Sequence, residues 1–194
     1  MATRMSSCPF LVSHKTHITC RYTDFVGELT AGLYGHSHPV IKKSIISVLN
    51  DVGINLGATI AQEHVHASAI CARFGLERVR FTNCGTEANL HALAAARAFT
   101  GKRKVVVFAG GYHGGVLTFA GGVPAANNVD RRDWIIAKYN DIESAVEVIK
   151  QPDVAAVLLE GMQGAPGAIK GSEAFLKSIE TTAKEVRNIL WVVS

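Results

Sequence analysis

The stretch FTNCGTEANLHALAAARAFTG (residues 81–101) carries the first group of residues whose types and spacing could do chemistry. Its pattern predicts a helix over 86–99, and the first turn of a helix leaves main-chain N–H groups without acceptors and adds a partial positive charge. Gly85 lets a ligand approach the backbone, the Thr86 hydroxyl can add a hydrogen bond, and Asn83 can orient the turn. This set favours an anion such as phosphate, with a simple helix cap by Thr86 as the alternative.

Side chains that transfer protons form a second group. Tyr112 and His113 lie in the glycine-flanked turn AGGYHGG, Glu160 follows an apolar run, and His36 and His38 lie in YGHSHP. A carboxylate at the mouth of a buried strand and a histidine that titrates near neutrality can act as general base and acid. The structural alternative is that His113 only holds its turn, and that His36 and His38 cap the next helix or pack at a dimer contact.

A metal site is not predicted. His64 and His66 in EHVHA are two residues apart, so in a helix they point to nearly opposite faces and do not converge on one ion. The four cysteines lie far apart and form no C-x-x-C pair, which argues against a zinc site or a disulfide framework and favours reduced thiols. These cysteines are Cys8, Cys20, Cys71 and Cys84.

Composition indicates a soluble globular protein. The chain has 194 residues, of which 48% are hydrophobic and 19% charged, with a formal net charge of +4. No window gathers enough Lys and Arg for a nucleic-acid or membrane surface, and no apolar run is long enough to span a bilayer. We expect a cytoplasmic protein. Organelle import is an alternative, because Arg4, Lys15 and Arg21 precede the first acid, Asp24.

Apolar runs with strand character alternate with helical patterns along the chain. Nearly all-apolar strands separated by helices predict an α/β fold with a mostly parallel sheet flanked by helices, whose ligands gather at the carboxyl ends of the strands. An N-terminal arm (1–24) is expected to precede one domain (25–194). The expected helices cover residues 38–50, 61–74, 86–99, 141–150 and 172–187. The expected strands cover residues 78–82, 104–110, 133–139, 154–160 and 189–193.

Three separated stretches resemble class III aminotransferases, especially the glutamate-1-semialdehyde aminomutase-like branch. Residues 81–115 resemble the family's F-x-N-S-G-T-E-A segment followed by a Y-H-G turn. Residues 22–41 resemble its entry segment, and 154–169 resemble its strand ending in E-P-x-x-G. The resemblance covers residues 22–193 and implies the large domain of a fold-type I enzyme that uses pyridoxal 5′-phosphate (PLP), usually as a homodimer with active sites at the interface.

The resemblance also implies roles for individual residues. Gly85 and Thr86 are expected to bind the cofactor phosphate, Tyr112 to stack on its ring, and Glu160 to lie near substrate and cofactor. Two positions depart from the family pattern, because Cys84 replaces a Ser and Gly161 replaces a Pro. The expected cofactor-binding residues are Asn83, Cys84, Gly85, Thr86 and Tyr112.

The Asp that protonates the cofactor ring and the Schiff-base Lys have no counterpart in this sequence. Aligning NILWVVS (188–194) with the family's strand puts Ser194 where that Asp stands. Ordinary transamination is not expected without both residues. Lys138 ends an apolar run and could stand in for the Schiff-base Lys, with a surface Lys as the ordinary alternative.

Three functions are consistent with these features. The first expectation is a diverged enzyme that uses the old PLP pocket, with PLP non-covalent or absent, for acid–base chemistry on a small molecule, such as an isomerase, lyase, aldol-type or cyclase step. The second is one part of a PLP-dependent aminotransferase or aminomutase completed by another chain. The third is a non-catalytic remnant that binds a partner. An apolar sheet edge also predicts a homodimer or higher oligomer.

Overall fold

The computed structural model describes residues 12–15, 21–186 and 190–193. The chain divides into two compact units, Met1–Val79 and Arg80–Ser194. We call them the N-terminal unit and the sheet unit, and each is described by itself.

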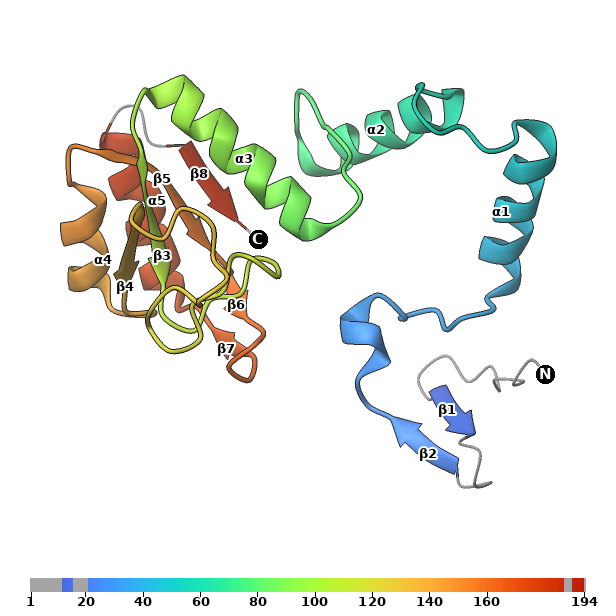
Figure 1. The fold of residues 1–194 in the computed structure, drawn as a ribbon, viewed down its shortest axis with the longest axis horizontal. Helices are drawn as coiled ribbons and strands as arrows, with labels where there is room; N and C mark the ends of the chain where they lie inside the picture. The colour runs from blue at the N-terminus through green and yellow to red at the C-terminus, as the bar shows by residue number, and fades with distance from the viewer. Residues whose placement is uncertain (1–11, 16–20, 187–189, 194) are drawn as a thin grey trace. The chain divides into compact units, whose positions relative to one another are not determined.

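A four-stranded parallel sheet forms the centre of the sheet unit, in the order β4-β3-β5-β8 (Figure 1). Its strands are β3 (Lys104–Phe108), β4 (Trp134–Ala137), β5 (Val154–Leu159) and β8 (Leu190–Val193). Valines and leucines dominate β3 and β5, and such side chains suit a strand that is covered on both faces. Because the strands are parallel, the segments that follow them meet at one edge of the sheet.

Helices cover both faces of this sheet (Figure 1). On one face, α3 (Gly85–Thr100) packs Leu93 and Ala96 against Val105 and Val107. On the other face, α4 (Ile142–Ile149) and α5 (Glu173–Glu185) pack against the alternate strand residues. The residues of this second core layer are Val106, Phe108, Ala137, Ala145, Ile149, Val154, Val157, Leu159, Phe175 and Ile179.

Local signals fix the ends of the helices. The Asp141 carboxylate accepts the N–H of Ser144 at the start of α4, and the Ser172 hydroxyl accepts the N–H of Phe175 at the start of α5. Helix α3 ends at Gly101, whose φ of 68° is the left-handed conformation that glycine favours.

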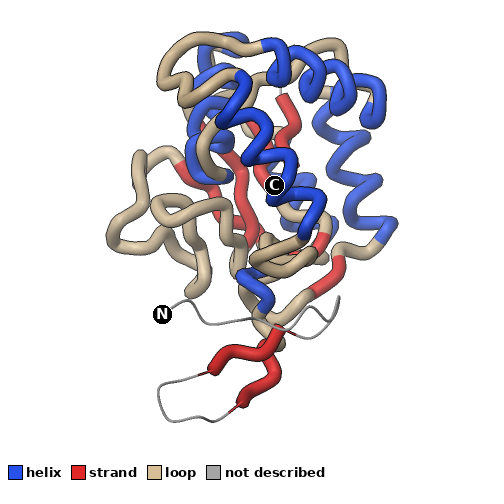
Figure 2. The backbone as a smooth tube through the Cα atoms, turned by 90° about the vertical axis from the view of Figure 1, so that its right-hand side faces the viewer, coloured by secondary structure: helices blue, strands red, loops and turns tan. Residues whose placement is uncertain are grey.

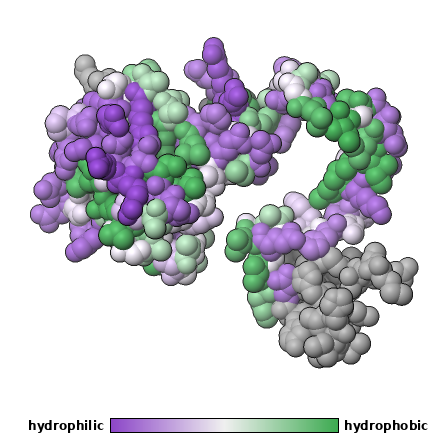
Figure 3. Space-filling view, viewed as in Figure 1, coloured by the Kyte–Doolittle hydropathy of each residue, from purple (hydrophilic) through white to green (hydrophobic). Residues whose placement is uncertain are grey.

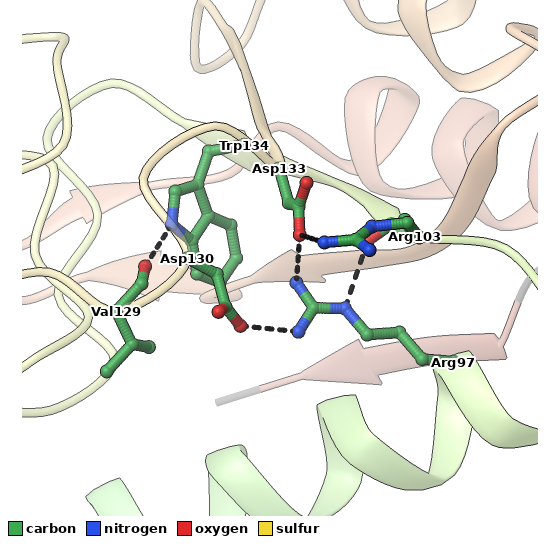
Figure 4. Close-up of polar contacts among 6 residues, drawn as sticks. All are labelled: Arg97, Arg103, Val129, Asp130, Asp133 and Trp134. Atoms are coloured by element: carbon green, nitrogen blue, oxygen red, sulfur yellow. Dashed lines mark hydrogen bonds and ion pairs between the residues drawn. The ribbon is translucent and has the colours of Figure 1, made fainter.

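An ionic network joins the last turn of α3 to the segment before β4 (Figure 4). Arg97 lies 2.5 Å from Asp130 and 3.7 Å from Asp133, and its Nε donates to the carbonyl of Arg103 at 3.0 Å. Arg103 in turn lies 3.1 Å from Asp133. The network therefore fixes the helix end to the amino ends of β3 and β4.

The described side chains of the N-terminal unit, residues 24–79, form no apolar core. The unit contains a hairpin of β1 (Val12–Lys15) and β2 (Arg21–Asp24), drawn in red at the bottom of Figure 2, then a short 3-10 turn η1 (Gly27–Thr30) and helices α1 (Pro39–Asp51) and α2 (Ala61–Phe74). No residue within 24–79 is buried. Hydrophobic side chains colour α1 green in Figure 3. The exposed apolar side chains of α1 are Val40, Ile41, Ile45, Ile46 and Leu49.

The structure confirms the α/β class and most of the expected elements. All five expected helices are present within about two residues of their expected ends, as are four of the five expected strands. The expected strand over 78–82 is wrong, because no described segment pairs with it and its backbone forms no ladder. The hairpin and two short strands, β6 (Met162–Gln163) and β7 (Ile169–Lys170), were not expected from the sequence.

Candidate functional site

The start of α3 is built by Asn83 and Glu87. The helix begins at Gly85 with Cys84 as its N-cap, and the Cys84 side chain makes no capping hydrogen bond. The Glu87 carboxylate instead accepts the main-chain N–H of Asn83 at 2.9 Å and its side-chain amide at 3.0 Å. These two hydrogen bonds hold the pKa of Glu87 below its usual value. Asn83 therefore orients the turn.

The glycine turn after β3 packs directly on the first turn of α3. The Thr86 hydroxyl oxygen accepts the N–H of Gly115 at 3.1 Å. A Cβ placed on Gly114 would lie 2.2 Å from Thr86 Oγ1 and 2.7 Å from its Cα, and the φ of Gly114 is +128°. Only glycine fits this approach. Thr86 is thus not the N-cap, and its hydroxyl links the helix to the turn.

A second side chain of α3 holds the same turn. Asn89 is buried, and its Nδ2 donates to the carbonyl of His113 at 2.8 Å. Thr86 and Asn89 are three residues apart, so they lie on the same face of the helix. Together they fix residues 113–115 against α3.

Side chains after β5 hold the other half of the turn. The Glu160 carboxylate accepts the N–H of Tyr112 through Oε2 and the N–H of Gly164 through Oε1, both at 3.1 Å. Gln163 is buried, and its Nε2 donates to the carbonyl of Ala109 at 2.9 Å. The turn that carries Tyr112 is therefore held by hydrogen bonds to α3 on one side and to the segment after β5 on the other.

The two ring-bearing residues of the turn have opposite environments. The Tyr112 side chain is 50% exposed, whereas His113 is 2% exposed and packs near Phe119. Neither ring nitrogen of His113 has a hydrogen-bond partner among the described residues. Burial lowers the pKa of His113 to about 4, so the ring is neutral near pH 7.

The main chain of Glu160 is also supported. The Tyr139 hydroxyl donates to the Glu160 carbonyl at 2.7 Å. Burial, with the Glu160 charge nearby, raises the pKa of Tyr139. Gly171 lies against this hydroxyl, since a Cβ on it would be 2.8 Å away, and its N–H donates to Gly161. The segment that follows β5 is therefore closely packed and held in position by main-chain contacts.

The structure brings most of the expected site residues to one edge of the sheet unit. Those joined by the contacts above are Asn83, Cys84, Gly85, Thr86, Tyr112, His113 and Glu160. His36 and His38 belong to the N-terminal unit, where His36 pairs with Glu28 and His38 packs edge-on to Tyr34. The catalytic roles of all these residues remain predictions.

Three residues of the site were not identified from the sequence. Asn89 and Gln163 are buried polar side chains, and Tyr139 is the partly buried residue two positions after β4. Asn89 carried a usable signal, since an amide one turn after Thr86 on an otherwise apolar helix face needs a partner when buried. Lys138, the suggested stand-in for a Schiff-base Lys, is exposed.

The donors at the start of α3 fit a phosphate group. The N–H groups of the first turn have no intrahelical acceptors, and the space beside Gly85 is open. Thr86 uses its oxygen to accept from Gly115, which leaves its hydroxyl proton available to an anion. The acid in this first turn, Glu87, accepts two hydrogen bonds from Asn83.

Among the helices that the structure describes, none has the length and apolar composition of a membrane span.

Comparison with known proteins gives consistent matches. The family model for class III aminotransferases matches residues 19–193. An uncharacterized aminotransferase of Schizosaccharomyces pombe is 48% identical over 161 residues, covering 82% of this chain and 36% of that protein. A β-phenylalanine transaminase of Variovorax paradoxus is 48% identical over 173 residues, covering 88% of this chain and 39% of that one. A glutamate-1-semialdehyde 2,1-aminomutase of Nitratidesulfovibrio vulgaris is 34% identical, covering 93% and 47%. The chain thus spans less than half the length of these relatives.

Solved structures agree with the fold. The structure of a β-phenylalanine aminotransferase from Variovorax paradoxus matches with a TM-score of 0.89 and 44% identity, covering 98% of this chain and 43% of that one. A transaminase with PLP bound matches with a TM-score of 0.84 and 26% identity, covering 97% and 46%.

Replacing Gly114 by Ala is expected to destabilise the sheet unit by more than about 3 kcal/mol, because the new methyl group would overlap Thr86 and the left-handed backbone disfavours it. Urea unfolding followed by circular dichroism measures this change. Gly115→Ala is the matched control, since its Cβ would meet open space, and its stability should remain near that of the wild type. Equal stability of the two variants would contradict the close contact.

Acid should destabilise the protein through His113. Between pH 6.5 and about 4 the unfolded chain binds a proton that the folded chain does not, so stability falls as pH falls, by about 1.4 kcal/mol per unit and about 3 kcal/mol in all. His113→Leu should lose this contribution, so its urea unfolding should depend less on pH over that range. The matched control is His64→Gln, which removes an imidazole at an exposed position. An unchanged slope in His113→Leu would contradict the neutral buried ring.

Proposed function

Because the chain belongs to the class III aminotransferase family, we propose that it supplies the phosphate-binding part of a PLP-dependent aminotransferase active site. The observation that carries this proposal is the contact of the glycine turn with Thr86, beside the open N-terminus of α3. That geometry suits a phosphate group next to an aromatic side chain.

The proposed work of the chain is binding and orientation. The first-turn N–H groups and the Thr86 hydroxyl would bind the phosphate, and the half-exposed Tyr112 would stack on the cofactor ring. PLP, when bound, supplies an electron sink for the substrate's reacting carbon. Glu160 accepts the N–H of Tyr112 and Asn89 donates to the carbonyl of His113, and these two contacts keep the turn in place. A catalytic role for His36 and His38 stays a proposal, and no contact among the described residues supports it.

The PLP-dependent alternative is better supported than the acid–base enzyme that the sequence analysis put first. The matching relatives are named as aminotransferases and aminomutases, and nothing in their names indicates PLP-independent chemistry. The chain spans 36%, 39% and 47% of their lengths, so the complete activity is proposed for a site that includes residues outside this sequence. The relatives' names also favour a small amino acid as the substrate, and the cytoplasm remains the expected compartment.

A homodimer is the second part of the proposal. Helices α1 and α2 have no buried residue, and five apolar side chains along α1 remain 44–68% exposed in the single chain. A continuous apolar face of this kind usually has a protein partner. A second copy of the chain is the partner we propose.

Light scattering at micromolar concentration should therefore give twice the mass of one chain. Ile45→Lys should shift the protein toward monomer, because it places a charge on the apolar face of α1. Ser47→Lys adds the same charge on the opposite, polar face of α1 and should leave the mass unchanged. A monodisperse wild-type monomer would exclude the dimer.

Phosphate binding is tested by comparing PLP with pyridoxal, which lacks the phosphate, in absorbance titrations of the chain. Thr86→Val removes the hydroxyl at nearly constant volume and should weaken PLP binding about tenfold, the value of one hydrogen bond to a charged group, without changing the binding of pyridoxal. Thr86→Ser keeps the hydroxyl and serves as control. Equal affinity of the wild type for PLP and pyridoxal would contradict the proposed site.

A further inference from the structure

The Glu160 carboxylate lies between two loops that follow neighbouring strands. Its Oε2 accepts the N–H of Tyr112, after β3, and its Oε1 accepts the N–H of Gly164, after β5. Strands β3 and β5 are adjacent and parallel, so these loops leave the same edge of the sheet. Each oxygen thus already has a main-chain donor, and the carboxylate links the loops 48 residues apart in sequence.

The position of Glu160 is itself well determined. The residue directly follows β5, whose residues are all buried, and its carbonyl accepts the Tyr139 hydroxyl. Gln163, three residues later, donates to Ala109 at the start of the same turn. Because Glu160 is fixed by these contacts, its hydrogen bond restricts the position of the Tyr112 main chain. A carboxylate acceptor makes this N–H hydrogen bond stronger than a neutral acceptor would.

We infer that Glu160 is a positioning residue for Tyr112, acting through the main-chain N–H of Tyr112 and not by exchanging protons with a substrate. Both carboxylate oxygens already accept main-chain N–H groups, so the side chain is held in place and is poorly suited to reach a substrate proton. The direction of the half-exposed Tyr112 ring then depends on Glu160. The inference rests on the proposed function in one respect only, namely that the Tyr112 ring faces the ring of PLP.

The structural part of the inference is tested without cofactor, by NMR of the labelled chain. In Glu160→Ala the amide protons of Tyr112 and Gly164 should exchange with solvent at least about tenfold faster than in the wild type, and the Tyr112 ring resonances should shift. In Glu160→Gln one carbonyl oxygen remains, so at least one of the two amides should lose protection. The amide of Gly115, held by Thr86, should be unchanged in both variants.

The matched control is Glu147→Gln, the same chemical change on the exposed side of α4. It should alter neither the two amides nor the Tyr112 ring. Unchanged exchange at Tyr112 and Gly164 in Glu160→Ala, or fast exchange with unmoved Tyr112 ring resonances, would overturn the inference.

The functional part uses the visible circular dichroism that a protein induces in bound PLP. Glu160→Ala should keep PLP affinity within about threefold, because the phosphate contacts are on α3, but should lose most of the induced signal, as should Tyr112→Leu. A wild-type signal in Glu160→Ala would overturn the positioning role. Absence of PLP binding in the wild type would refute the proposed function alone, since the NMR result would still decide whether Glu160 positions Tyr112.

Discussion

Strands β3 and β5 lie between two layers of helices, and this burial determines where chemistry can occur in the sheet unit. Every residue of β5, and all of β3 after Lys104, is at most 1% exposed, so these positions have to be apolar. Polar side chains can appear only beyond the strand ends, where Glu160 and the turn with Tyr112 lie. The helix start at Gly85 reaches the same edge, since α3 packs across the strands. The site is a consequence of this layer order.

The fold was predictable where the sequence pattern is local and strong. Runs such as VAAVLL in β5 are apolar throughout, and helices α4 and α5 begin at Asp141 and Ser172, which are typical capping residues. Residues 78–82 look similar in isolation, but a strand needs a neighbour to accept its hydrogen bonds, and that information is not local. The hairpin β1–β2 was missed for a different reason, because it carries no Asn-Gly or Asp-Gly turn signal.

The site was predictable in its residues and less so in their connections. Resemblance to a family pointed to Thr86, Tyr112 and Glu160, and the structure places them at one edge of the sheet. It could not reveal that the Thr86 hydroxyl accepts from Gly115 or that both Glu160 oxygens have main-chain donors. Hydrogen bonds of side chains to the backbone of a distant turn depend on tertiary packing, which leaves little pattern in the sequence.

Helix α3 carries the proposed phosphate-binding turn at one end and the Arg97 network near the other. Thr86 and Arg97 are 11 residues apart, which corresponds to about 16 Å along the helix axis. In physiological salt, charges are screened over about 8 Å, so the ion pairs of Arg97 with Asp130 and Asp133 exert almost no field at Thr86. Surface charge near the amino ends of the strands can therefore vary, in evolution or by design, to suit a different temperature or salinity. The electrostatic environment of the proposed anion site would change little.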